Sequence, residues 1–320
     1  MVLGKRLIEV KFGLRVPTFP VDGSNETGFV NQILKFLEEL EENFDSAWID
    51  DHFVPWAGFV PKTTPTLESF TAISYLSGKF RRLNFGNTVL CNSYRNPALL
   101  AKMGATLQTL TEGRFILGIG AGWKEDEYIA YSYDFPPPKV RIKQLEEGIQ
   151  IIKALWNEGS ATFKGKYYKI DEACCYPKPD PIPPIMIGGG GEKLTLKVVA
   201  RHADWWNIPN VSPETYQQKL RVLEENCRKE GRNPSEIVKT LANMVAIAKT
   251  DKESWNLASR SQFIEKGKEE NYIIGDPDAI TEKLTNYTKL GVEHFILRFV
   301  DFPNTDGAKL FAKEVIPTFM

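Results

Sequence analysis

Residues Gly113–Gly122 read GRFILGIGAG, a short apolar run that leads directly into spaced glycines. An apolar run bounded by glycine fits a strand that is covered on both faces, as the strands of parallel sheets are. Gly118, Gly120 and Gly122 lack side chains where the strand ends, so a flat ring or a phosphate could approach the backbone. The same glycines could instead only make room for a turn and for close packing.

Seven further segments have strand character, and segments with helical spacing of apolar residues separate them. The predicted strands, besides the one quoted, are Val10–Val16, Ser46–His52, Arg82–Leu90, Ile185–Ile187, Asp204–Asn207, Val238–Ala248 and His294–Val300. The predicted helices are Thr27–Asn43, Leu67–Leu76, one starting at Asn96-Pro97, Val140–Asn157, Glu192–Arg201, Thr215–Lys229, Asp276–Leu290 and one near Lys309–Phe319. Eight strands alternating with helices predict an α/β fold, a (β/α)8 TIM barrel in which residues 1–320 form a single domain.

Two insertions interrupt the predicted alternation. Residues 123–139 follow the fourth strand and contain three consecutive prolines. Residues 161–168 precede the fifth strand and have the alternation of a small hairpin outside the core. Residues 251–272 are polar and receive no assignment, and the loop 17–26 is expected to be too polar to pack.

A doubly wound dinucleotide fold competes with the barrel because the strand predicted at Gly113–Gly122 contains Gly-x-Gly. The full fingerprint needs a third glycine three residues later. Counted from Gly118 and Gly120, that position is Trp123, and counted from Gly120 and Gly122 it is Glu125. The spacing therefore disfavours a dinucleotide-binding fold.

The composition is that of an ordinary globular protein, with 42% hydrophobic and 25% charged residues and a net charge of −1. It predicts neither a nucleic-acid partner nor a membrane protein. The start, Met1 to Arg6, lacks the features of a secretory signal, so a cytoplasmic protein is expected. Four cysteines without a CxxC pair and three histidines suggest no metal site, and the thiols are interpreted as reduced.

Ligands of such barrels bind where the strands end, so those ends are the candidate site. The second strand ends in Asp51-His52, whose imidazole could stack on a ring or hydrogen-bond a reacting atom, or could simply cap a loop. The fifth strand ends in Gly188–Gly191 before a helix, where backbone N–H groups could bind an anion. A flexible loop is the alternative there.

The third and fourth strand ends add further candidates. Residues 88–92 supply a hydroxyl, a thiol and an amide, and Cys91 is interpreted as a small buried residue rather than a nucleophile. Glu125, Asp126 and Glu127 follow the fourth strand. They include candidate general acids, although a run of carboxylates is most often a solvated face.

Several segments together resemble the luciferase-like family of flavin and deazaflavin oxidoreductases, and the resemblance covers nearly the whole chain. The matching segments are Trp48–Phe53, Tyr94–Lys102, Gly113–Trp123, Pro184–Gly191 and Ala203–Asn207. An Asp-His pair at the second strand end is similar to the branch of this family that uses coenzyme F420. This deazaflavin carries hydride and does not activate oxygen.

The resemblance implies a set of site residues. His52 would lie against the deazaflavin ring with Asp51 nearby, and Thr88-Val89 matches the position of a non-prolyl cis peptide behind the ring. The implied cofactor-binding residues are Thr88, Val89, Asn92, Ala121, Gly122, Gly189, Gly190 and Gly191, the last three at the phosphate. A small organic substrate and a homodimer are expected.

One departure bears on the substrate. The sugar-phosphate dehydrogenases of the family have a catalytic Glu directly after the fourth-strand glycines, where this chain has Trp123. Glu125, two residues later, remains the candidate acid, and a sugar-phosphate substrate is in doubt. Trp56, Trp123 and Trp205 near the strand ends indicate a more apolar substrate pocket.

Three functional hypotheses follow. The first is an oxidoreductase that passes hydride between bound F420 and an organic substrate, with His52 as the catalytic residue. The second is an FMN-dependent luciferase-like monooxygenase, and the third is a non-catalytic flavin-binding barrel. The Asp51-His52 pair favours the first hypothesis over the second.

Overall fold

The computed structural model describes residues 9–320. The hexamer Met1 to Arg6, on which the expected localisation depends, lies outside the described residues. Within residues 9–320, the helices are too short or too polar to cross a membrane.

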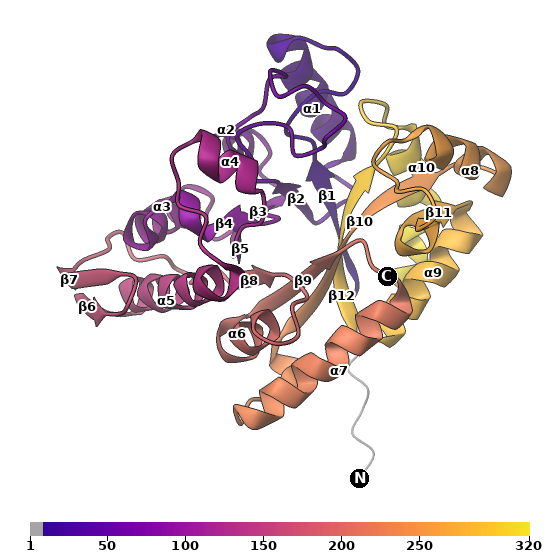
Figure 1. The fold of residues 1–320 in the computed structure, drawn as a ribbon. Coiled ribbons are helices and arrows are strands. Elements are labelled where there is room, and N and C mark those ends of the chain that lie inside the picture. Colours follow the sequence, from indigo (N-terminus) through magenta and orange to yellow (C-terminus); the bar gives the residue numbers. More distant parts are fainter. Residues whose placement is uncertain (1–8) are drawn as a thin grey trace.

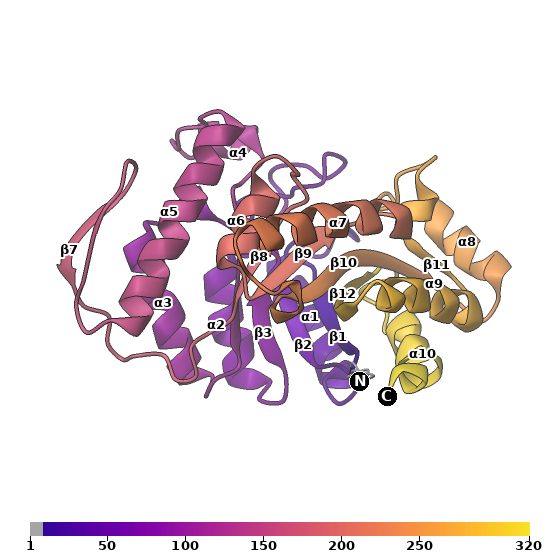
Figure 2. The same cartoon turned by 90° about the horizontal axis from the view of Figure 1, so that it is seen from below.

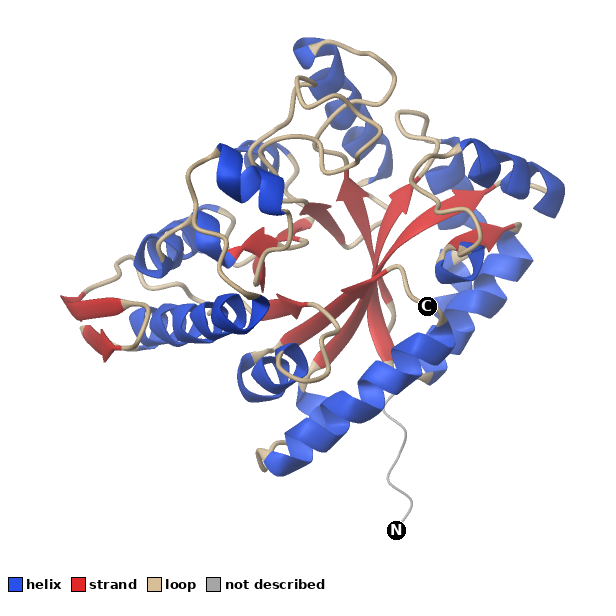
Figure 3. Ribbon diagram, in the orientation of Figure 1, coloured by secondary structure: helices blue, strands red, loops and turns tan. Residues whose placement is uncertain are grey.

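Eight parallel strands close into a barrel, which confirms the predicted fold (Figure 1). In order around the barrel they are β1 (Lys11–Val16), β2 (Ser46–Ile49), β3 (Asn84–Asn87), β5 (Phe115–Gly120), β8 (Ile185–Gly188), β9 (Trp205–Pro209), β10 (Val238–Ile247) and β12 (Val292–Phe299). The barrel is closed because β10 pairs with both β9 and β12, and β12 pairs with β1. Figure 3 shows the strands as a ring of arrows inside the helices.

Eight helices cover the barrel, and several of them begin at a residue whose side chain caps the helix. They are α1 (Glu26–Leu40), α2 (Ser69–Lys79), α3 (Pro97–Leu110), α5 (Pro138–Asn157), α6 (Thr195–His202), α7 (Pro213–Lys229), α9 (Pro277–Lys289) and α10 (Asp306–Glu314). The side chains of Asn25, Asn96 and Asp276 each accept a bond from a backbone N–H of the helix that they precede. Such bonds satisfy N–H groups that would otherwise lack partners.

The predicted third strand is interrupted. It divides into β3 and β4 (Leu90–Cys91), and both parts pair with β5. The peptide bond between Thr88 and Val89, at the interruption, is cis. This confirms the non-prolyl cis peptide that the family resemblance implied at this position.

Several elements were missed or misplaced by the sequence analysis. They are α4 (Glu125–Ala130), α8 (Asp251–Arg260), the strand β11 (Ile273–Gly275) beside β10, and the second hairpin strand β7 (Lys169–Ala173), which pairs with β6 (Ala161–Lys164). In α8 only Ser254 and Ala258 are buried, so the helix lacks the apolar stripe that reveals most helices. The hairpin projects beyond α3 and α5 (Figure 2).

Two boundaries also differ from the predictions. Residues 17–20 are buried, so this part of the first loop packs against the protein instead of remaining in solvent. The helix predicted over Glu192–Arg201 is α6, and it begins at Thr195 because a turn separates it from the preceding glycines. That turn is closed by a bond from the Leu196 N–H to the Gly191 carbonyl.

The indole of Trp48 fills the interior of the barrel. A Cβ atom at Gly13 would lie 2.5 Å from its Nε1, and one at Gly86 would lie 2.3 Å from its ring. The indole N–H donates to Ser46 Oγ at 2.7 Å, and Ser46 Oγ lies 2.9 Å from Nε2 of His294. Burial lowers the pKa of His294 to about 3, so its ring is neutral and Nε2 can accept the hydroxyl proton of Ser46.

Candidate active site

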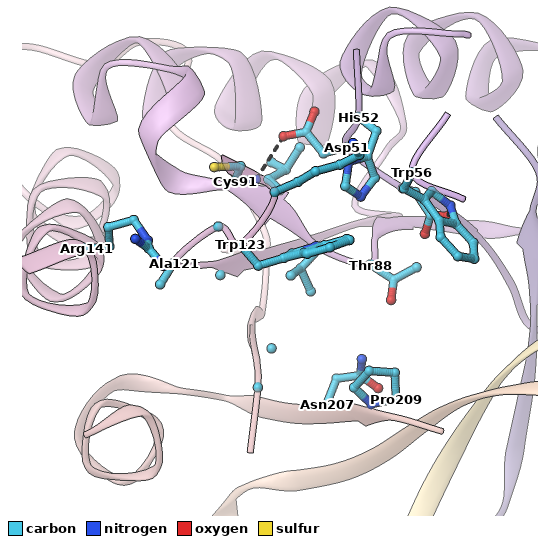
Figure 4. Close-up of a pocket in the computed structure, with 18 of the residues that line it drawn as sticks. Asp51, His52, Trp56, Thr88, Cys91, Ala121, Trp123, Arg141, Asn207 and Pro209 are labelled. Carbon is cyan, nitrogen blue, oxygen red and sulfur yellow. Dashed lines mark hydrogen bonds between the residues drawn. The ribbon is translucent and has the colours of Figure 1, made fainter. Parts of the chain in front are cut away.

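A cavity of about 520 Å³ opens at the carboxyl ends of the strands. Its walls come from the ends of β1, β2, β5, β8 and β9, from the Thr88-Val89 interruption, and from the first turn of α5. In Figure 4, Arg141 lies at one end and Trp56 at the other, with Trp123 between them. The cavity is therefore elongated, and its two ends carry different side chains.

His52 and Glu127 form the central polar contact of this cavity. The Oε2 atom of Glu127 lies 2.8 Å from Nδ1 of His52, and the Glu127 side chain is fully buried. Its other oxygen accepts the backbone N–H groups of Phe53 and Val54, and the Tyr94 hydroxyl donates to Oε2 at 3.1 Å. Since the carboxylate accepts the Nδ1 proton, Nε2 of His52 is the ring nitrogen left for a ligand.

Asp51 has its carboxylate tied to the protein. Its two oxygens each accept a 2.9 Å bond from Arg95, and Oδ2 also accepts the backbone N–H of Cys91 at 2.8 Å (Figure 4). Arg95 in turn contacts Glu68, the residue that caps α2. Asp51 therefore fixes the loop after β2 to the Cys91 segment, and its charge is already compensated.

Two glycines and Val89 form the cavity floor. A Cβ atom at Gly120 would lie 2.9 Å from the side chain of Val89, and one at Gly188 would lie 2.8 Å from it. Real Cβ atoms do not approach so closely, so larger residues would displace Val89 or the strands. Gly120 and Gly188 therefore make room for the side chain of Val89, and all three residues line the cavity.

Cys91 lines the cavity beside this floor. Its sulfur lies 2.9 Å from the Tyr128 hydroxyl, and burial raises the pKa of its thiol to about 11. The thiol is therefore protonated at neutral pH, as expected for a buried structural cysteine.

Arg15, Asp50 and Trp56 line one end of the cavity. Arg15 binds both oxygens of Asp50, at 2.8 and 3.1 Å, and the indole N–H of Trp56 donates to Asp50 at 3.1 Å. The Arg15 guanidinium also lies 5.6 Å from the centre of the Trp56 ring. These contacts hold the indole in one orientation at the cavity wall.

Arg141, Gly189 and Thr195 line the opposite end. The Arg141 side chain is 7% exposed and stacks on Phe135 with 3.9 Å between the guanidinium carbon and the ring centre. Its Nε atom has no hydrogen-bond partner among the described residues. A buried cation with a free N–H and a hydroxyl nearby would suit an anionic group.

The structure brings most of the predicted site residues together. Those that line the cavity are Asp51, His52, Trp56, Thr88, Val89, Ala121, Gly122, Trp123 and Gly189. Five others are placed elsewhere. Gly190 and Gly191 pack toward Ile208 and Thr195, where a Cβ atom would lie 2.4 and 2.7 Å from the nearest side-chain atoms.

The other three residues lie outside the cavity, each for a different reason. Asn92 is buried beneath α5 and contacts Tyr168. Trp205 stands at the start of β9, which runs on to Pro209, so its ring lies inside the barrel near Trp48. Glu125 is exposed, because it begins α4 on the face opposite to the buried Glu127.

The sequence analysis did not select several lining residues, among them Arg15, Asp50, Asn207, Arg141 and Thr195. Strand alternation could have found the first three, since Arg15, Asp50 and Asn207 share the inward face with residues two positions earlier. Glu127 required the position of α4, a six-residue helix inside a proline-rich segment. No local pattern of residues indicates this helix.

Comparisons with known proteins find relatives over most of the chain. The sequence profile described as "Luciferase-like monooxygenase" matches residues 10–272. An F420-dependent glucose-6-phosphate dehydrogenase of Amycolatopsis mediterranei is 34% identical over 317 residues, which cover 89% of this chain and 93% of the relative.

Solved structures share the fold. An F420-dependent secondary alcohol dehydrogenase, in complex with an F420-acetone adduct, superposes with a TM-score of 0.83 at 21% identity over 98% of this chain and 99% of its own. The oxygenating constituent of 3,6-diketocamphane monooxygenase of Pseudomonas putida, in complex with FMN, superposes with a TM-score of 0.76 at 18% identity, over 98% and 99%.

Proposed function

The chain belongs to the luciferase-like monooxygenase family, and on that premise we propose that it is an F420-dependent oxidoreductase acting on a small organic substrate. The relative that is 34% identical over nearly the whole chain is named for F420. The observation that carries the proposal is the bond between Glu127 and His52 at the cavity wall. This bond holds the imidazole of His52 in a fixed orientation toward a ligand in the cavity.

The residues present fit a deazaflavin. Val89, Gly120 and Gly188 pack together at the floor, where two of the three residues carry no side chain, and a planar ring could lie against them. F420, when bound, carries the hydride that the substrate gains or loses. His52 and Trp123, whose rings meet edge to face with centres 5.7 Å apart, would cover the ring from the opposite side.

The end with Arg141 would hold the cofactor phosphate. Arg141 would supply the charge and Thr195 a hydroxyl. The Gly189 N–H already donates to the Asn207 carbonyl, so Gly189 would leave room for the phosphate without donating to it. We assign Gly190 and Gly191 to the packing of this turn instead of to direct contact. The ring then lies toward His52 and Trp56, since the cavity is elongated.

His52 would exchange the proton that accompanies hydride transfer. Glu127 holds the Nδ1 proton and stabilises positive charge on the ring, so Nε2 can accept a proton from a substrate hydroxyl or return it to a carbonyl oxygen. Asp51 acts through its bonds to Arg95 and Cys91, which position the loop that carries His52. The exposed Glu125 is not required in this scheme.

The cofactor assignment can be tested by titrating the purified protein separately with F420 and with FMN and following fluorescence. We expect saturable F420 binding that weakens in Arg141→Gln. A His52→Ala variant should still bind F420, less tightly than the parent because one covering ring is lost, and should lose substrate-dependent F420 reduction. Tight binding of FMN without F420 binding would overturn the proposal and support a flavin-dependent monooxygenase instead.

We also propose that two copies associate through α2 and α3. Tyr75 of α2 and Leu99 and Leu110 of α3 are each more than half exposed, and Leu99 borders a groove shared with Phe70 and Ser74 of α2. Exposed apolar side chains on two neighbouring helices could form the contact patch of an interface. Light scattering should give the mass of a dimer for the parent and of a monomer for Leu99→Glu.

A further inference from the structure

An open groove of about 460 Å³ adjoins the active-site cavity, and we call it the outer groove. It is lined by two tryptophans, three charged residues and one isoleucine, namely Trp56, Trp123, Lys124, Glu125, Asp126 and Ile129. The first three also line the cavity that contains His52. In Figure 4 the ring of Trp123 lies beneath His52 and points toward Trp56. The two tryptophans are therefore a rim that the cavity and the outer groove share.

The short helix α4 turns its outer face to this groove. Glu125 and Ile129 are four residues apart and share that face, whereas Glu127 and Tyr128 are buried on the other. Ile129 is 67% exposed, and Trp123 is 63% exposed. A single exposed apolar residue needs no explanation, but two that line one groove beside a ligand cavity form a surface that an apolar ligand would cover.

The charged groups of the outer groove balance one another. Nζ of Lys124 lies 2.7 and 2.8 Å from the two oxygens of Asp126, and Lys62 contacts the same carboxylate at 2.8 Å. Glu125 adds a second negative charge, so two lysines stand against two acids. Among these four residues no positive charge is left over for a phosphate or a carboxylate. The groove therefore favours an uncharged group.

The cavity wall next to the groove is also compensated. Arg15 binds both oxygens of Asp50, and the indole N–H of Trp56 donates to the same carboxylate. Arg141, whose Nε atom lacks a partner among the described residues, lies at the opposite end, where we place the cofactor phosphate. A substrate at the His52 end thus meets aromatic surface and an ion pair that is already formed.

The position of the reacting carbon directs the rest of the substrate outward. In the proposed function the cofactor runs from Arg141 to His52 along a cavity of about 520 Å³ and occupies most of its length. The reacting carbon must lie beside the cofactor ring, and its oxygen must reach Nε2 of His52. Because the cofactor fills the other direction, a large substituent on this carbon extends past Trp123 and Trp56 toward the outer groove.

We propose that the outer groove binds an apolar substituent of the substrate, so that the enzyme acts on uncharged alcohols, or the matching carbonyl compounds, that carry a long alkyl or aryl group. This rests on the proposed function for the redox step, but not for apolar binding in the groove. Oxidation moves the carbinol hydrogen as hydride to the cofactor and the hydroxyl proton to His52, and reduction of the carbonyl compound reverses both transfers. Ile129 takes part in neither transfer and determines only which substituent is bound.

The experiment titrates the protein calorimetrically with 2-butanone, 2-hexanone, 2-octanone and 2-decanone, with and without oxidised F420. A ketone and oxidised F420 cannot exchange hydride, so binding is measured apart from turnover. Each methylene group that becomes buried should raise the affinity by about threefold. 9-Oxodecanoate has as many carbons as 2-decanone but ends in a carboxylate, and it should bind about tenfold more weakly than 2-decanone.

The variant Ile129→Ser removes apolar surface from the groove. It should lower the ratio of the affinities for 2-decanone and 2-butanone by about fivefold, and Ile129→Leu should retain that ratio. Ile182 is 48% exposed and lines neither the cavity nor the groove, so Ile182→Ser is the matched control and should keep the parental ratio. In F420-linked oxidation of the corresponding 2-alkanols, kcat/KM should follow the same order.

Each contrary result identifies what fails. Equal affinity for all four ketones in the parent, an unchanged ratio in Ile129→Ser, or equal binding of 9-oxodecanoate and 2-decanone would overturn the assignment of the groove. Ketone binding that depends on chain length and on Ile129, in a protein that does not bind F420, would refute the proposed function and leave the groove intact. F420 reduction by 2-alkanols at rates independent of chain length would refute the groove and leave the proposed function intact.

Discussion

The carboxylate of Glu127 lies 2.8 Å from Nδ1 of His52, although 75 residues separate them in the chain. Glu127→Gln keeps the size of the side chain and replaces the charged acceptor of the Nδ1 proton by a neutral amide, so the hydrogen bond that orients the ring is weakened. We expect kcat to fall by about 10- to 100-fold with F420 affinity unchanged. Steady-state kinetics and fluorescence titration would show this.

The matched control is Glu125→Gln, which removes the same charge from the exposed start of α4. It should behave like the parent. A kinetic loss of similar size in both variants would mean that general charge near α4, and not the bond to His52, matters.

Arg141→Gln removes the unpaired cation from the phosphate end of the cavity. Loss of one charge-assisted contact should weaken F420 binding by about 10- to 100-fold, measured by fluorescence titration. The exposed Lys143, two residues later in the same helix, provides the control variant Lys143→Gln. Equal affinity of Arg141→Gln and the parent would place the phosphate elsewhere.

Gly188→Ala would disturb the cavity floor. Its new methyl group would lie 2.8 Å from Val89, and relieving that contact should cost about 1–3 kcal/mol of unfolding free energy. We expect lower urea stability together with weaker F420 binding. Gly78→Ala in α2, where no atom lies within 4 Å of the added group, should retain F420 affinity. Unchanged binding in Gly188→Ala would argue against a ring on this floor.

His294 should make the protein less stable in mild acid. Its pKa is about 3 when folded and near 6.5 when exposed, so only the unfolded chain takes up a proton between these values. Stability is complete above pH 6.5 and falls as pH decreases, by up to about 1.4 kcal/mol per unit from this group. Urea unfolding at several pH values should show a shallower decline for His294→Gln. Parallel curves would exclude a buried neutral imidazole.

The four cysteines should differ in reactivity. Cys174 is exposed, whereas Cys91, Cys175 and Cys227 are buried, and burial raises the pKa of each of these three thiols. A thiol reagent should therefore modify Cys174 rapidly in the native protein and the others only after unfolding. Mass spectrometry of the labelled peptides identifies the sites. Fast labelling of Cys91 would show that its segment opens readily.

The sequence was sufficient for the barrel because each strand and most helices carry a local signature. The apolar run before Gly118 and the Asn96-Pro97 start of α3 are patterns of adjacent residues, and they appear where they were predicted. Element ends were less accurate. Trp205 was assigned to a strand end, but β9 continues for four more residues, and that extension moves the ring from the cavity into the barrel.

The candidate site was only partly predictable because its contacts join distant segments. Asp51 and His52 could be selected from their place after a strand, yet the partners that define them, Arg95 and Glu127, lie on other elements. Choosing Glu127 over Glu125 depended on which face of α4 is buried. No local pattern distinguishes the two acids before the helix is positioned.

The indole of Trp48 has a kinetic consequence. It fills the barrel axis against Gly13 and Gly86, so the axis offers no passage beneath the active-site cavity. Ligands that lie one behind the other in such a blind cavity must enter and leave through the same opening. The ligand on the cavity floor, which we propose is the cofactor, therefore binds before the substrate and leaves after it. This predicts a compulsory-order pattern in initial-rate and product-inhibition measurements.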